Sequence, residues 1–148
     1  MPEITRSAMI DAEPRAIWQM VSDPAQAPRW MPDLKERRLL TAGGLDAGSQ
    51  WEDHGLLRGK AYRAKYQVIE WNPPHHFAYQ QISSSQAGYV WIERVSVAGE
   101  SGGTRVTLSL NYEMPGGLAG KLYEKLIFRK DFGATLENRL EALRELAA

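Results

Sequence analysis

The hydrophobic residues of this chain change their spacing once, close to residue 117, and that change limits the folds open to it. Before this point apolar and polar side chains alternate, which is typical of strands with one buried face. After it, apolar residues recur at steps of three, four and seven, which predicts one stripe of a long helix from about Leu118 to the C-terminus. The stripe consists of Leu122, Leu126, Gly133, Leu136, Leu140 and Leu143. Charged residues, Arg139 among them, are expected on the other side of this helix.

The alternating part of the chain predicts six strands separated by turn residues. The alternation is clearest in residues 104–112, whose apolar side holds Val106, Leu108, Leu110 and Tyr112. The strand spacing of about 8–14 residues favours a continuous antiparallel sheet with one buried and one wet face. The six predicted strands are 34–40, 49–57, 62–71, 77–83, 89–97 and 104–112.

The N-terminal part predicts one further strand and two short helices. Residues 3–10 alternate weakly, as a strand does. Residues 13–21 carry Pro14 near their start, where proline fits the first turn of a helix. Asp23 and Pro24 mark a second helix start, because aspartate caps and proline fits the first turn. Prolines further along keep this second helix short.

The predicted order of elements is strand, two short helices, six strands and long helix, which indicates an α+β fold. The long helix has to cover its apolar stripe, and the buried face of the sheet is the largest apolar surface available. We therefore expect a curved antiparallel sheet of about seven strands wrapped around the C-terminal helix. If the sheet curves away from the helix, the gap between them becomes an apolar pocket, where small ligands bind.

Length and composition exclude several classes of protein. The 148 residues suit one domain spanning 1–148. Eighteen basic residues balance eighteen acidic ones without a basic run, which argues against a nucleic-acid partner. Cysteine is absent and only three histidines occur, so we expect no metal and no cofactor. No motif for covalent catalysis, phosphate binding or dinucleotide binding is present.

The apolar segments of the chain are short. None approaches the roughly 18 consecutive apolar residues that a membrane span requires. The N-terminus lacks the basic start and apolar stretch of a signal peptide. The expectation is a cytoplasmic protein without a membrane span.

Five segments carry a family resemblance through their order and spacing. They are residues 10–18 (IDAEPRAIW), 23–32 (DPAQAPRWMP), 68–74 (VIEWNPP), 103–107 (GTRVT) and 112–118 (YEMPGGL). Together they resemble the START-like, or SRPBCC, superfamily, in particular its polyketide cyclase/dehydrase and lipid-transport branch. The resemblance covers nearly the whole chain and implies the helix-grip fold. The superfamily includes lipid carriers, cyclases, hydrolase-like members and chaperone regulators, so the fold does not settle the function.

Two charged residues are candidates for chemistry. Arg129 falls on the helix stripe, where a cation could hold a carboxylate or a polarised carbonyl. The alternative is that its stem packs while its head reaches water. Glu93 lies on an otherwise apolar strand face, where it would act as a general acid or base with a raised pKa. Alternatively Glu93 pairs with Arg129, or a bulge turns it outward.

Two further positions have competing interpretations. Gly133 sits inside the predicted helix, where its missing side chain leaves room for a ligand or allows a close contact with a strand or another subunit. Asp53 and His54 are neighbours on one strand and must face opposite sides, so they cannot form a dyad. We expect this pair to lie in a wet position near a turn.

Aromatic residues dominate the predicted inner face of the sheet. Aromatic walls with hydroxyl groups suit a flat or ring-bearing ligand, and the alternative is plain core packing. The candidate ligand-binding set is Tyr66, Tyr79, Trp91, Tyr112, Leu122, Leu126, Arg129 and Gly133.

Three functions are compatible with these observations. The first is binding of a hydrophobic or aromatic small molecule, such as a lipid, polyketide or isoprenoid, between sheet and helix. The second is a cyclase or dehydratase in which Glu93 and Arg129 face one cavity. The third is a protein-interaction module, which predicts a filled core and an exposed apolar patch. Exposed apolar residues around Leu56–Leu57 or Leu118 could serve a homodimer.

Overall fold

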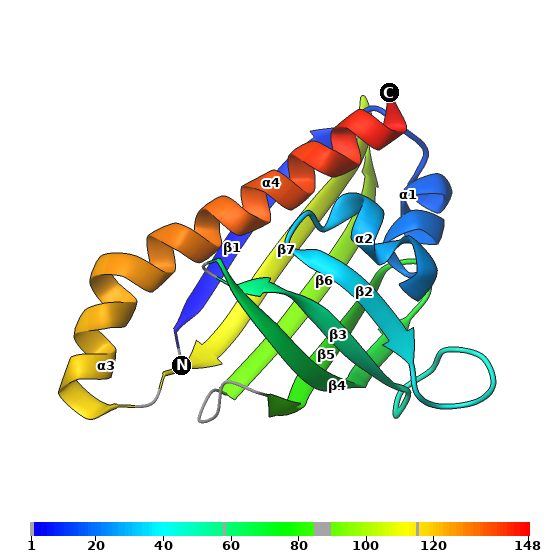
Figure 1. The fold of residues 1–148 in the computed structure, drawn as a ribbon. Helices are drawn as coiled ribbons and strands as arrows, with labels where there is room; N and C mark the ends of the chain where they lie inside the picture. Colours follow the sequence, from blue (N-terminus) through cyan, green and yellow to red (C-terminus); the bar gives the residue numbers. More distant parts are fainter. Residues whose placement is uncertain (1, 58, 85–89, 115) are drawn as a thin grey trace.

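The computed structural model describes residues 2–57, 59–84, 90–114 and 116–148. Figure 1 shows one sheet, a long C-terminal helix and two short helices near the N-terminus. The strands are β1 (Glu3–Ile10), β2 (Leu34–Leu39), β3 (Gln50–Leu57), β4 (Lys60–Asn72), β5 (His76–Ser84), β6 (Val90–Glu100) and β7 (Gly103–Glu113). The helices are α1 (Pro14–Val21), α2 (Ala27–Trp30), α3 (Gly117–Tyr123) and α4 (Arg129–Ala147). A 3₁₀ turn, η1 (Pro24–Gln26), precedes α2, and a π-helical turn, η2 (Glu124–Phe128), joins α3 to α4.

The sheet is antiparallel throughout and has the strand order β1-β7-β6-β5-β4-β3-β2. Chain neighbours therefore pair as hairpins from β2 to β7, and among the described strands only β1 pairs out of order, against β7. This confirms the predicted α+β helix-grip architecture, because the long helix crosses one side of the curved sheet (Figure 1). Residue 89, the predicted start of the fifth of the six strands, lies outside the described residues.

Alternation of side chains places one face of the sheet in the core. In β7 the residues from Thr104 to Tyr112 alternate strictly between buried and partly exposed. Its register with β6 pairs Trp91 with Tyr112 and Glu93 with Leu110, so these four side chains share the inner face. The predicted inner faces of these strands are thus confirmed.

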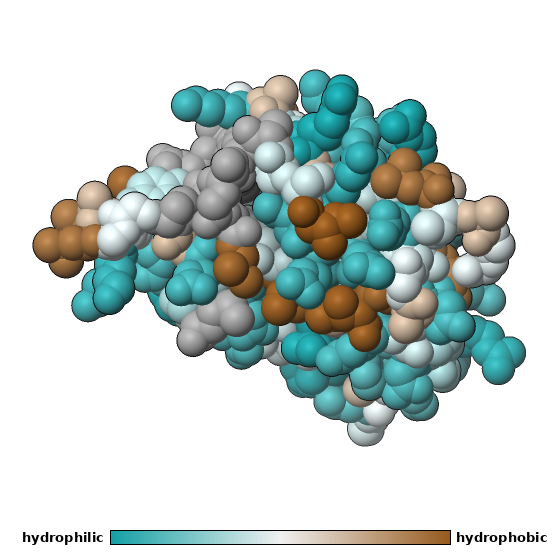
Figure 2. All heavy atoms as spheres, turned by 90° about the horizontal axis from the view of Figure 1, so that it is seen from below, coloured by the Kyte–Doolittle hydropathy of each residue, from teal (hydrophilic) through white to brown (hydrophobic). Residues whose placement is uncertain are grey.

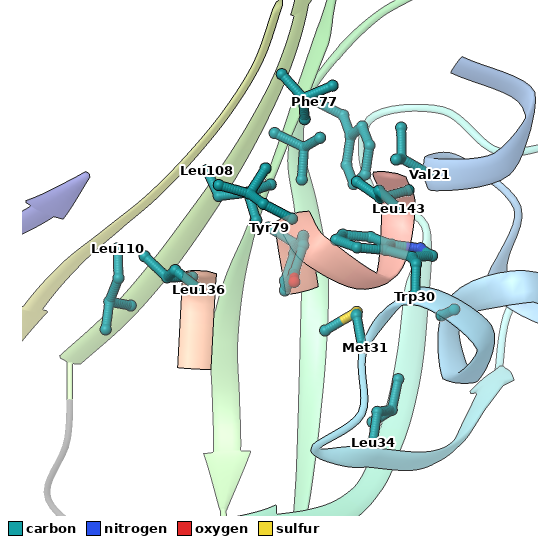
Figure 3. Packing of buried hydrophobic residues seen from close by; sticks show 14 of the residues in the cluster. Val21, Trp30, Met31, Leu34, Phe77, Tyr79, Leu108, Leu110, Leu136 and Leu143 are labelled. Atoms are coloured by element: carbon teal, nitrogen blue, oxygen red, sulfur yellow. The ribbon is translucent and has the colours of Figure 1, made fainter. Parts of the chain in front are cut away.

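The core is filled from three sources. Figure 3 shows side chains of α4, of the two N-terminal helices and of the sheet gathered in one cluster. The labelled members are Leu136 and Leu143 from α4, Val21 and Trp30 from α1 and α2, Met31 just after α2, and Leu34, Phe77, Tyr79, Leu108 and Leu110 from the strands. All of them are fully or almost fully buried. The N-terminal helices therefore close the end of the grip near the C-terminus.

The long helix does not use the predicted stripe along its whole length. Leu136, Leu140 and Leu143 are buried as expected, but Leu122 and Leu126 are 59% and 65% exposed. No residue of α3 is buried, since this part of the helix extends past the sheet (Figure 1).

Phe128 and Phe132 take the inward positions instead. The π-helical turn η2 inserts extra length into the helical repeat and so changes its phase across Glu124–Phe128. The inward orientation predicted for Leu122 and Leu126 is therefore wrong, because the helix extends past the sheet and because the π-helical turn changes its phase.

Among the described residues, no helix combines the length and apolar character of a membrane span.

Candidate functional site

Arg139 of α4 forms the centre of a buried ion cluster. Its Nε and Nη2 donate to Oδ1 and Oδ2 of Asp33 at 2.9 and 2.6 Å, and its Nη1 donates to Oε1 of Glu93 at 2.7 Å. Trp91 Nε1 donates to the other oxygen of Glu93 at 2.9 Å. The cluster joins the helix to β6 and to the residue that precedes β2.

Electrostatics keep Asp33 and Arg139 of this cluster charged. Burial alone would raise the pKa of Asp33, but attraction and hydrogen bonds from Arg139 outweigh it and hold that pKa below the usual value. Burial disfavours the charge on Arg139, yet Asp33 and Glu93 raise its pKa well above the usual range. Both groups are therefore ionised around neutral pH.

A second buried ion pair lies on the neighbouring strands. Arg37 of β2 donates from Nε and Nη2 to both oxygens of Asp53 on β3, at 2.9 and 3.0 Å. The guanidinium also donates to Tyr79 Oη at 3.3 Å and lies 4.4 Å from the ring centroid of Trp51. Burial opposes the charge on Arg37, but Asp53 outweighs it and raises the pKa of Arg37.

The second pair corrects one expectation from the sequence. Asp53 and His54 do face opposite sides of β3, as predicted, and His54 Nε2 lies 2.8 Å from Oε1 of Glu52 on the outer face. Asp53, however, is only 2% exposed and is not in a wet position. Its burial depends on Arg37, a partner on another strand that the local sequence around Asp53 does not reveal.

The aromatic residues predicted to point inward do so. Tyr66, Tyr79, Trp91 and Tyr112 are each at most 6% exposed. Tyr66 contacts Tyr79 edge-on with ring centroids 5.2 Å apart, and Trp91 contacts Phe132 in the same way at 5.1 Å. Burial raises the pKa of the Tyr66 and Tyr79 hydroxyls, so both stay neutral. Their role in ligand binding stays a prediction.

A cavity of about 270 Å³ opens between α4 and the β2–β3 side of the sheet. Phe128 and Phe132 form its apolar part, with stacked rings whose centroids are 5.6 Å apart. Asp33 reaches this cavity, which therefore touches the ion cluster around Arg139. The complete lining is Asp33, Leu56, Phe128, Asp131, Phe132, Ala134, Thr135 and Asn138.

A second hollow of about 650 Å³ lies under α3. It is lined by Pro2, Glu113, Met114, Gly117, Lys121 and Glu124. Within the described part of the chain, neither lining includes the four inward aromatic residues. No three His, Cys, Asp or Glu side chains among the described residues gather so that they could hold a metal ion.

Arg129 does not reach the interior. Its side chain is 47% exposed and pairs with Glu124 at 3.0 Å, while Nη1 donates to the backbone oxygen of Glu3 at 3.1 Å. Glu124 in turn accepts from the hydroxyl of Tyr112. The expected inward cation at position 129 is wrong, because the guanidinium pairs at the surface with Glu124 and with the backbone of β1.

Glu93 faces inward as expected, but its partner is Arg139 and not Arg129. The sequence places Arg139 on the outer side of the helix, yet its side chain is only 4% exposed. The signal was present, since Arg139 follows Leu136 by three positions and precedes Leu143 by four. Asp33, which precedes β2, carried no periodic signal of its own.

Gly133 permits a close contact with a strand, the second of its two interpretations. A Cβ built on Gly133 would lie 2.5 Å from Nη2 of Arg6 on β1. Arg6 Nε also donates to Glu137, one turn further along α4, at 3.1 Å. Space for a ligand at Gly133 is therefore not what the missing side chain provides.

Comparison with known proteins places these features in a family. The family model described as polyketide cyclase/dehydrase and lipid transport matches residues 1–148. A search of curated proteins gives no match. The chain has the helix-grip fold of the START-like proteins, and it belongs to the polyketide cyclase/dehydrase and lipid transport family.

Solved structures agree with this fold. A START superfamily protein from Mycobacterium smegmatis superposes with a TM-score of 0.79 at 19% identity, covering 98% of this chain and 96% of that one. A protein from Thermus thermophilus gives 0.76 at 18% identity, over 99% and 100% of the two chains. The major latex-like protein 151 of Panax ginseng gives 0.80 at 13% identity, over 99% and 97%.

Proposed function

We propose that this protein binds a small hydrophobic molecule, of lipid, polyketide or isoprenoid type, at the cavity between α4 and the β2–β3 side of the sheet. The stacked Phe128 and Phe132 carry the proposal, because they form the apolar part of the lining of a cavity of about 270 Å³. This volume lies just below the range of about 300–1,000 Å³ typical of ligand pockets, so the expected ligand is small or only partly enclosed. Membership of a lipid-transport family supports the same function.

The ion cluster favours binding over catalysis. A cyclase was expected to place Glu93 and Arg129 at one cavity, but Arg129 lies at the surface. Both oxygens of Glu93 accept hydrogen bonds, from Arg139 and from Trp91. A carboxylate whose two oxygens both accept such hydrogen bonds has a structural role and is a poor general acid or base.

Native mass spectrometry of freshly purified protein, followed by organic extraction, tests this proposal. Ala134 lines the cavity and is exposed, so Ala134→Trp should fill the cavity without disturbing the core. Glu141→Trp is the matched control, since Glu141 is exposed on the same helix outside the cavity lining. We expect a co-purifying small molecule in the wild type and in Glu141→Trp, and its loss in Ala134→Trp. A clean wild-type protein that also takes up no apolar fluorescent probe would contradict the proposal.

A further inference from the structure

The N-terminal part of the long helix carries an apolar surface that the fold does not use. Leu118, Leu122 and Leu126 repeat every four residues and are 86%, 59% and 65% exposed, and Ile127 beside them is 40% exposed. We call these four residues the leucine ridge. Figure 2 views the molecule from below and shows hydrophobic residues at the end that projects from the body, where Figure 1 places α3. Four large apolar side chains on one projecting helix are unusual on a monomer surface.

Positive charge borders the leucine ridge. Lys121, Lys125 and Lys130 are all exposed, and they lie between and just after the ridge residues. Residues 117–130 hold four basic residues against one acidic residue, although the whole chain is balanced at eighteen of each.

The single acid of this segment does not cancel that charge at the surface. Glu124 turns toward the body, where it accepts hydrogen bonds from Tyr112 and Arg129, and its side chain is only 15% exposed. The nearest acids along the chain, Glu113 and Asp131, lie beyond the two ends of the ridge. The outward side of this helix therefore combines leucine with lysine.

We propose that the leucine ridge docks on an anionic lipid surface. An amphipathic helix with leucines on one side and lysines beside them inserts its apolar side at the headgroup boundary, while the lysines meet the lipid phosphates. The charges argue against a second copy of this chain as the occupant. Pairing two ridges face to face would bring Lys121 and Lys125 of each copy toward those of the other. The proposal goes beyond ligand binding and does not depend on it.

The position of the leucine ridge on the protein supports docking on a lipid surface. The hollow of about 650 Å³ under α3 includes Lys121 in its lining, so the helix that carries the ridge also borders an open hollow of the protein. Tyr112 and Arg129 hold the helix to the body through Glu124 and the backbone of Glu3. The ridge is thus presented on a fixed element.

Co-sedimentation with vesicles tests the docking surface. The full chain is mixed with phosphatidylcholine vesicles and with vesicles that also contain phosphatidylglycerol. We expect binding only to the anionic vesicles, and its loss at high salt. Lys121→Gln with Lys125→Gln should weaken binding by roughly fivefold for each lysine, since each contributes about 1 kcal/mol near an anionic surface. Leu122→Ser with Leu126→Ser should weaken binding at least about tenfold.

Matched variants elsewhere on the surface serve as controls. Leu39→Ser with Leu40→Ser changes two leucines of 37% and 40% exposure away from the ridge. Lys60→Gln with Lys65→Gln removes two exposed lysines from β4. Both controls should bind as the wild type does, and thermal melting should show all variants folded.

Three results would overturn the proposal. The first is no binding to anionic vesicles. The second is binding that the ridge variants and their controls lose equally. The third is a concentration-dependent dimer, seen by light scattering, that Leu122→Ser with Leu126→Ser abolishes, because this would assign the ridge to a second copy of the chain.

Discussion

The guanidinium of Arg6 occupies the space that a side chain at Gly133 would need. A Cβ on Gly133 would lie 2.5 Å from Nη2 of Arg6, so the glycine near the start of α4 allows β1 to lay a long side chain across the helix. The obstructing atom is the end of a flexible side chain that is 38% exposed. The contact is therefore close but easily rearranged.

Gly133→Ala should change stability little. Alanine in a helix interior gains about 1 kcal/mol over glycine, and displacing Arg6 loses an exposed ion pair with Glu137 that contributes at most about 1 kcal/mol. In an Arg6→Ala background the same change should stabilise by up to about 1 kcal/mol, because the obstruction is gone. Urea unfolding of the wild type, Gly133→Ala, Arg6→Ala and the double variant measures both changes in the free energy of unfolding. A loss of ligand in Gly133→Ala would instead restore the interpretation of this glycine as ligand space.

The phase of the long helix predicts unequal costs for truncating its apolar residues. Phe132→Ala should destabilise the protein by about 3–5 kcal/mol, because it removes a ring packed on Trp91 and Phe128. Leu126→Ala, which lies on the expected stripe but is 65% exposed, should stay within about 0.5 kcal/mol of the wild type. Thermal and urea unfolding distinguish the two. Equal losses would mean that Leu126 packs inward after all.

The ion cluster predicts a large difference between two arginines of the same helix. Arg139→Met leaves Asp33 and Glu93 buried without their cation, which should cost about 3–5 kcal/mol. Arg129→Met is the matched control, because it breaks a pair that is largely at the surface and should cost at most about 1 kcal/mol. It should also leave ligand affinity unchanged. Denaturant unfolding of Arg139→Met and Arg129→Met measures the loss in free energy of unfolding for each. Similar losses would indicate that Arg139 lies at the surface.

The cost of Arg139→Met should depend on pH. In the wild type the pKa of Asp33 is lowered, so this group stabilises the fold above the unfolded pKa of about 3.9 and loses that contribution as the pH falls through the lower, folded value. Without Arg139, burial is left to raise the pKa of Asp33, and protonation then relieves a destabilising charge. Denaturant unfolding at about pH 7 and about pH 3 should show a smaller difference in the free energy of unfolding between the wild type and Arg139→Met at the lower pH. A difference that is constant with pH would contradict the assignment.

The cavity between α4 and the β2–β3 side favours a ligand whose polar end donates hydrogen bonds. Asp33 and Asp131 lie in its lining, while the cation nearest to Asp33, Arg139, is directed at Asp33 and Glu93. A twelve-carbon alcohol should therefore bind at least about tenfold more tightly than the fatty acid of equal length, because like charges are costly at a contact. Displacement of a fluorescent probe measures the affinity for the alcohol and for the fatty acid, and Asp131→Asn should reduce the difference between these two affinities. Tighter binding of the fatty acid would reject this preference but keep the proposed function, whereas displacement by neither would count against that function.

The sequence by itself determined the elements of this protein, because side-chain periodicity is a local property. Alternation in residues 104–112 and the repeat of Leu136, Leu140 and Leu143 each follow from the geometry of one strand or one helix. The antiparallel order followed from turns between successive strands. The inward direction of Tyr79, Trp91 and Glu93 followed in the same way.

Only the tertiary structure decided which groups meet. Arg139 and Asp33 lie 106 residues apart in the chain, and no periodicity relates a helix to the end of a distant loop. The π-helical turn changed the phase of the long helix ahead of α4, where Leu122 and Leu126 face outward, while Phe128 and Phe132 line the cavity. A phase shift of this kind depends on how the helix fits the sheet, and the contacts that set it join residues far apart in the sequence.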